Sequence, residues 1–221
     1  MFNGGRSGTA IAQWLGLAGP YRSIFQPDWV VLLIRDGWGE AFNPENEFHY
    51  AAVGEGFDIV HSWHWEHMSA LKRLLIRSHF RDIALFQYGI RHFTELRRGG
   101  GGPPLADGGG RRAQLRAIDW TLPRLRQAYP NLVIVHVPYG SAPLGGLMPA
   151  SLVEERLVAA CRRLEIPCIP MRPVFENDFA RSKRPPFGFA NTLPWAGHPN
   201  GHGHDLIARE LGSFFRKTLA K

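Results

Sequence analysis

The sequence predicts an α/β fold built on a parallel sheet, and two observations support this. Short β-branched apolar runs at residues 29–34 and 132–137 are apolar at successive positions, which is typical of strands covered by helices on both faces. Amphipathic helical patterns separate these runs, and parallel strands need crossover helices of that kind. The chain has 221 residues, of which 44% are hydrophobic, so it is long enough for one domain with a full core.

Turn residues bound the predicted strands. A Pro-Asp pair precedes the first run, a Pro-Asn pair precedes the second, and Pro138 closes it. A third, shorter strand is expected at residues 166–171. Three strands are few for an α/β chain of 221 residues. The first residues, Met1 to Gly5, also look like the end of a strand that runs into a glycine turn. A further strand is therefore expected upstream of Met1.

Apolar residues recur at helical spacing in five stretches, at 9–17, 68–87, 111–128, 150–164 and 203–220. Residues 97–110 are rich in glycine and proline, which predicts a surface loop rather than a boundary between domains. The chain is accordingly expected to form a single domain over residues 1–221.

Composition argues against several classes of protein. The apolar run at 29–34 is far too short to cross a bilayer. The formal charge is +7, but the arginines are scattered and accompany no recognised nucleic-acid motif, so no nucleic-acid partner is expected. Cys161 and Cys168 are spaced wrongly for a metal knuckle, and they fall in apolar patterns. Two buried thiols fit a reducing compartment, which favours the cytoplasm.

The most informative segment is His198-Pro199-Asn200-Gly201-His202-Gly203-His204. A loop delivers His198, and the next residues turn the chain into an amphipathic helix. A general base needs such rigid presentation and a pKa near neutrality, so His198 is the candidate catalytic residue.

This segment resembles the last sequence block of the SGNH (GDSL-type) hydrolases, which reads H-x-N-x-x-G-H before a hydrophobic helix. The resemblance implies a flavodoxin-like three-layer α/β/α sandwich and a Ser–His–Asp triad that hydrolyses ester or acyl bonds. Residues 3–9 resemble the family's second block, and Pro27-Asp28 follows at the usual distance. In that family the amide of the glycine here numbered Gly8 helps to form the oxyanion hole.

Three departures from the family pattern are evident. No G-D-S turn is present, and no nucleophile is identified: Ser7 belongs to the second block, and Ser141 follows a strand but has no implied base. The third block has Asp36 or Gly37 near the position of an oxyanion-hole asparagine, and a carboxylate cannot donate that hydrogen bond. Trp195 stands where the triad acid is expected.

Other groups could compensate for these losses. Asp178 or Glu176 could hold the His198 imidazole in place of the missing acid. In the family the first strand lies between the second and the third, so the fold is expected to lack that strand. The nucleophile is then expected on the upstream segment, with a serine esterase or acyl hydrolase as the leading function. The substrate would be a small ester or acylated molecule, no cofactor is implied, and this chain alone is expected to be inactive.

Two alternatives remain open at the level of sequence. The chain could be a non-catalytic binding or accessory protein on the same scaffold. His61, His64 and His67 recur every third residue, which on a helix would place them on one face. Together with His198, His202 and His204 they would suggest a zinc site, although a histidine-rich cap over the cleft explains them without a metal, and none is predicted.

Overall fold

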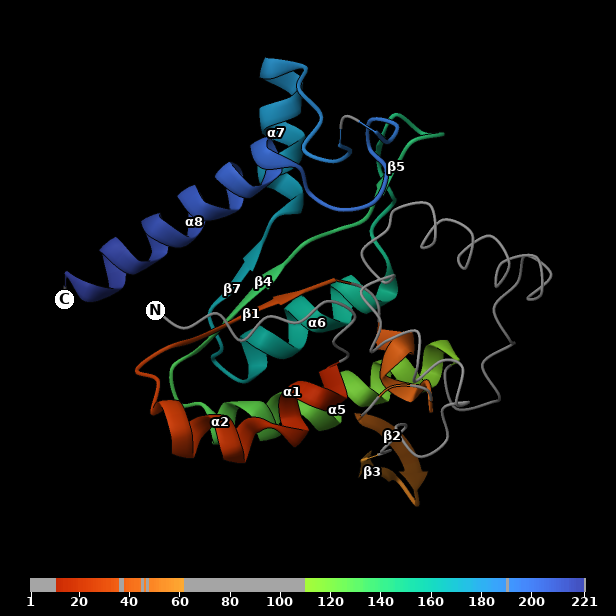
Figure 1. The fold of residues 1–221 in the computed structure, drawn as a ribbon, viewed down its shortest axis with the longest axis vertical. Helices are drawn as coiled ribbons and strands as arrows, with labels where there is room; N and C mark the ends of the chain where they lie inside the picture. Colours follow the sequence, from red (N-terminus) through yellow and green to blue (C-terminus); the bar gives the residue numbers. More distant parts are fainter. Residues whose placement is uncertain are drawn as a thin grey trace, which may run out of the picture.

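The computed structural model describes residues 11–35, 38–44, 46, 48–61, 110–189 and 191–220. The predicted helix at 68–87, most of the predicted loop at 97–110 and the glycine-rich block containing Gly8 lie outside these residues. The described part is mixed α/β, with six α-helices and a three-stranded parallel sheet (Figure 1).

The three predicted strands all form and pair with one another. The strands β1 (Val30–Ile34), β4 (Leu132–His136) and β7 (Cys168–Pro170) lie in the order β1-β4-β7, and both pairs are parallel. Within the described part, β1 is therefore at one edge of the sheet and β4 is in the middle. Four of the five residues of β4 are aliphatic and the fifth is His136, and all five are buried, which suits the middle of the sheet.

Helical periodicity predicted most of the helices well. The helices α5 (Arg111–Ala128), α6 (Leu152–Arg163) and α8 (Gly201–Leu219) match their expected stretches, and Ser151 and Asn200 cap α6 and α8. The helix expected at 9–17 corresponds to α1 (Ile11–Gly16), and α2 (Ala18–Phe25), which follows it, was not predicted. The helix α7 (Arg172–Ser182) was not predicted, because its apolar residues are too few to make a clear stripe.

Two small hairpins were also missed. The strands β2 (Phe48–Val53) and β3 (Gly56–His61) pair through a tight turn at Gly54, whose φ of 57° suits glycine. The strands β5 (Gly140–Ser141) and β6 (Gly146–Leu147) form a shorter hairpin after β4. A 3-10 helix, η1 (Trp38–Phe42), precedes β2.

Two cores flank the sheet. Leu32, Ile34 and Ile134 belong to the first core, with side chains from α1, α2, α5, α6 and the β2–β3 hairpin. Val135 belongs to the second core, with side chains from α7, α8 and the loop that contains His198. Because alternate residues of a strand point to opposite faces, the two cores lie on opposite sides of β4.

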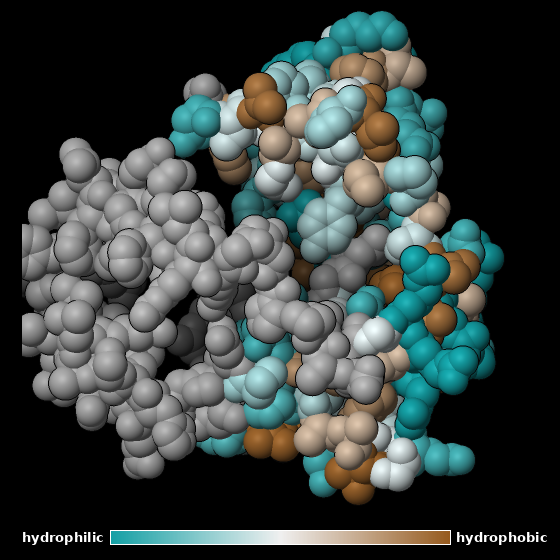
Figure 2. Space-filling view, turned by 90° about the vertical axis from the view of Figure 1, so that its right-hand side faces the viewer, coloured by the Kyte–Doolittle hydropathy of each residue, from teal (hydrophilic) through white to brown (hydrophobic). Residues whose placement is uncertain are grey.

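The described helices include no candidate membrane span. None of the helices in the described ranges is long and apolar enough to cross one. On the face drawn in Figure 2, the apolar residues of the described part lie scattered among polar ones rather than gathered in one broad patch.

Candidate active site at the carboxyl ends of the strands

The loop between α7 and α8 carries His198 and is folded against itself. Phe187 and Pro199 form an isolated antiparallel bridge, and the Gly188 amide donates to the His198 carbonyl at 3.3 Å. Gly188 has a φ of 93°, and a Cβ there would lie 2.5 Å from the Leu193 carbonyl oxygen. These contacts fix the backbone of His198 at the junction with α8, as the sequence predicts.

Trp195 stands where the SGNH pattern has the triad acid, and its side chain packs in the second core. Its side chain is buried, stacked on Phe187 with ring centroids 6.2 Å apart and edge-on to Phe179 at 4.8 Å. The Trp195 backbone is left-handed, with a φ of 68°. Its carbonyl oxygen lies 2.5 Å from the position of a Cβ on Gly140, so only a glycine fits there. Trp195 thus anchors the loop in the second core and on β5.

Arg35 ties this loop to the sheet. It directly follows β1, and its Nη2 donates to the Gly197 carbonyl at 3.1 Å, next to His198. Its guanidinium also lies over the Tyr139 ring, 4.0 Å from the centroid, just beyond the end of β4. The His198 loop is therefore held at the carboxyl ends of the strands, where α/β sheets place their ligands. A charged residue immediately after an apolar strand is a sequence signal that could have singled out Arg35.

The imidazole of His198 is exposed, and no side chain of the described residues hydrogen-bonds to it. The two carboxylates expected to hold it lie elsewhere. Asp178 accepts or shares a hydrogen bond with His202 Nε2 at 2.7 Å, and Glu176 lies 3.6 Å from Arg172. The expectation that Asp178 or Glu176 orients His198 is therefore wrong, because both have other partners.

The histidine that has a carboxylate partner is His202. Both side chains of the pair with Asp178 are largely buried, with 13% and 14% of their surface exposed. Ser182 Oγ also donates to the same Asp178 oxygen, at 3.0 Å. Partial burial opposes ionisation of Asp178, but hydrogen bonds from His202 and Ser182 and the charges of His202 and Arg209 outweigh it and lower the pKa of the carboxyl. The family pattern assigned His202 no such role, and no spacing in the sequence points to Asp178 as its partner.

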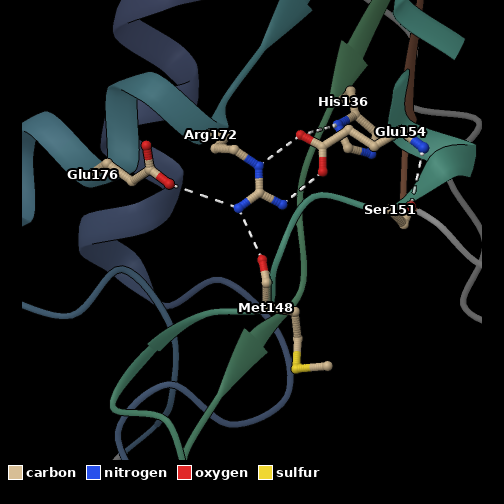
Figure 3. A network of polar contacts seen from close by, with 6 residues as sticks. All are labelled: His136, Met148, Ser151, Glu154, Arg172 and Glu176. Carbon is tan, nitrogen blue, oxygen red and sulfur yellow. Dashed lines mark hydrogen bonds and ion pairs between the residues drawn. The ribbon is translucent and has the colours of Figure 1, made fainter. Parts of the chain in front are cut away.

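A second polar cluster lies beside the end of β4 (Figure 3). His136 is fully buried, and its Nδ1 is 3.8 Å from Glu154 Oε1. Arg172 binds both oxygens of Glu154, donating from Nε at 2.8 Å and from Nη2 at 2.6 Å. Its Nη1 donates to the Met148 carbonyl at 2.8 Å. This network joins α6 to the start of α7 and to the chain after β6.

The remaining candidate residues do not complete a triad in the described residues. Ser141 is half-buried in β5, and no histidine lies within hydrogen-bond distance of its hydroxyl there. Gly8, Asp36 and Gly37 lie outside the described residues.

The histidines do not assemble into a metal site in the part of the chain that is described. His61 ends the strand β3 and stacks on Phe48 at 4.5 Å, so the helical arrangement considered for the three histidines does not apply to it. His64 and His67 lie outside the described residues. Across the described ranges, no group of three or more histidine, cysteine or acidic side chains is placed to hold an ion.

Comparisons with protein-family models, with curated proteins and with solved structures give no match to this chain. Function is therefore inferred from the site itself. That site comprises an exposed histidine on a braced loop and an arginine that ties the loop to the sheet, and the Asp178–His202 pair on α7 and α8 is separate from it.

Proposed function

We propose that this chain carries the histidine side of an SGNH-type ester or acyl hydrolase. In this proposal His198 is the general base, and the Gly8 amide contributes to the oxyanion hole. The serine lies on a segment outside residues 1–221. The observation that carries the proposal is the hydrogen bond from Arg35 to the Gly197 carbonyl, which holds the His198 loop at the carboxyl end of β1.

The chemistry would follow from that placement. His198 would take the proton of the serine hydroxyl as its oxygen attacks the acyl carbon, and would then give that proton to the departing alcohol or amine. Backbone amides would stabilise the negative charge that develops on the carbonyl oxygen. The substrate class is a small ester or acylated molecule, and the reaction needs no cofactor.

The sheet is consistent with this proposal. In the SGNH arrangement, a three-layer α/β/α sandwich, a further strand lies beside the one that corresponds to β1. In the described part of the chain β1 is at the sheet edge, and Val31 and Leu33 are 38% and 50% exposed on its second face. An added strand and its helix would cover these two side chains.

A non-catalytic binding protein on the same scaffold is the second candidate, and one observation favours it. The exposed imidazole of His198 lacks a carboxylate neighbour among the described residues, and the acid position is filled by the buried Trp195. An imidazole without an orienting acid is a much weaker base in such sites.

The test joins residues 1–221 to the segment encoded in frame upstream and measures hydrolysis of p-nitrophenyl acetate. We expect His198→Ala to lower kcat by at least about a thousandfold, because the general base is lost. His204→Ala is the matched control, since His204 is also exposed, in the first turn of α8, and it should stay close to the parent. An upstream segment without G-D-S, or an active His198→Ala enzyme, overturns the proposal.

The chain by itself gives a second readout. A fluorophosphonate probe reacts with activated serines, and we expect no labelling of residues 1–221. Labelling that a single serine substitution within this chain abolishes would show that the nucleophile is here after all.

A further inference from the structure

A polar hollow of about 670 Å³, the α8 hollow, lies along α8 and is formed by residues that the proposed hydrolysis does not use. Its walls are formed by the following side chains: Arg184, His202, Asp205, Ala208, Arg209 and Arg216.

The polar side chains of α8 that line the hollow share one face of the helix. At 3.6 residues per turn, positions 202, 205, 209 and 216 lie within a narrow arc, so their side chains point the same way. Ile207 lies on the opposite face and Leu206 beside the polar arc, and both are buried in the second core. The packed face therefore fixes the orientation of the polar one.

Arg184 reaches the hollow because the chain before the His198 loop runs against the start of α8. The Asn200 side chain donates to the Pro185 carbonyl at 2.9 Å, and the Asn200 amide donates to the Pro186 carbonyl at 3.0 Å. A Cβ on Gly203 would lie 2.3 Å from the Pro186 oxygen, so the contact is backbone against backbone. Arg184 is thus attached to a fixed segment rather than to a free loop.

Two further contacts place side chains of the hollow. The guanidinium of Arg216 folds back along the helix, with Nη1 3.4 Å from the place of a Cβ on Gly212. Asp178 holds His202 Nε2 at 2.7 Å, which keeps the imidazole in position. The three arginines of the hollow form no ion pair with any carboxylate of the described residues, and Asp205 is the one acidic side chain in the wall.

We propose that the α8 hollow binds a phosphate group, with Arg184, Arg209 and Arg216 as its charged donors and His202 as a fixed neighbour. Guanidinium groups present planar pairs of N–H donors that match phosphate oxygens, and three of them around one hollow favour a dianion over a singly charged carboxylate. The phosphate belongs either to a soluble phosphate ester or to a phospholipid headgroup. This site is separate from His198 and does not depend on the proposed hydrolysis.

The experiment titrates inorganic phosphate into the full chain by calorimetry, at constant ionic strength set with sodium chloride. We expect saturable binding at one site, weakened about tenfold by Arg209→Gln and by Arg216→Gln, because each loses a charge-assisted hydrogen bond. Arg181→Gln is the matched control: Arg181 is exposed on α7, donates to the Asn177 carbonyl and lies outside the hollow. All three positions are exposed, so the variants should fold, which circular dichroism checks.

A second arm separates the two sources of phosphate. Sedimentation with phosphatidylcholine vesicles that contain phosphatidic acid, lost in Arg209→Gln but not in Arg181→Gln, identifies a lipid headgroup. Binding of free phosphate without vesicle binding identifies a soluble ester. Absence of saturable phosphate binding, or equal weakening by Arg181→Gln, overturns the proposal. Neither result bears on the esterase test, which uses His198→Ala.

Discussion

The two faces of the parallel sheet are covered to different extents. On the first face, Leu32 and Ile34 of β1 are buried to the same degree as the residues of β4 beside them. On the second face, Val135 of β4 is fully buried, whereas Leu33 of β1 is 50% exposed. The first face contains most of the apolar core, and the second contains the loop of His198 and the pair of Asp178 with His202.

The first face therefore contributes mainly to stability, and the second carries the candidate functional side chains. The first core is made almost wholly of aliphatic and aromatic side chains. Around the second core, polar contacts decide where the functional side chains lie, namely the bonds of Arg35, Arg172 and Asn200. Substitutions on the first face should therefore change folding, and those on the second should change the site with smaller effects on folding.

The largest effect is expected from the ion pair that joins the two sides. Replacing Arg172 with leucine leaves the Glu154 carboxylate, 8% exposed, without its bidentate partner next to the buried His136. Breaking such a pair should lower the free energy of unfolding by about 3–5 kcal/mol in urea denaturation. Adding Glu154→Gln should restore much of the loss. A loss below about 1 kcal/mol would mean that α6 and α7 are joined by packing alone.

Adjacent residues of β1 test the difference between the faces directly. Leu32→Ala should destabilise the protein by about 2–5 kcal/mol, because Leu32 is 2% exposed in the first core. Leu33→Ala should cost less than about 1 kcal/mol, because half of that side chain is already in water. Equal losses in thermal denaturation would show that the second face is covered over β1 as well.

Alanine substitutions at two glycines of α8 should change the stability of the protein in opposite directions. Gly203→Ala should destabilise by about 1–3 kcal/mol, because the new Cβ meets the rigid Pro186 backbone. Gly212→Ala should stabilise by up to about 1 kcal/mol, because alanine favours the helix and, among the described residues, the new Cβ would meet the flexible Arg216 side chain. Stabilisation by both substitutions would mean that the start of α8 does not press on the segment before the loop.

The smallest effect concerns pH. The folded state lowers the pKa of Asp178, so this carboxyl stabilises the protein above its unfolded pKa of about 4, and the contribution is lost as pH falls through the lower, folded pKa. The stability difference between the parent and Asp178→Asn should thus be largest near neutral pH and shrink below about pH 4. Denaturation at several pH values measures it. A difference that stays constant down to pH 2.5 would contradict the ionised pair.

Much of the fold could be predicted, and the reasons are local. The short continuous apolar runs at 29–34 and 132–137 mark strands, and the 3.6-residue spacing marks α5, α6 and α8, because each pattern reflects one element's own geometry. The β2–β3 hairpin was missed although Gly54 and Gly56 mark a turn between two runs that contain Tyr50 and Phe57. Two such runs separated by a short glycine-containing turn are the sequence signal of a β-hairpin.

The sequence by itself determined the three strands of the parallel sheet, most helices and the position of His198 just before the last helix. These follow from residue periodicity and from the turn residues around them. The tertiary structure alone decided which side chains meet: Asp178 with His202 across 24 residues, and Arg35 with the Gly197 carbonyl across 162. Such partners depend on how separate elements pack, and the spacing of residues along the chain carries no record of that packing.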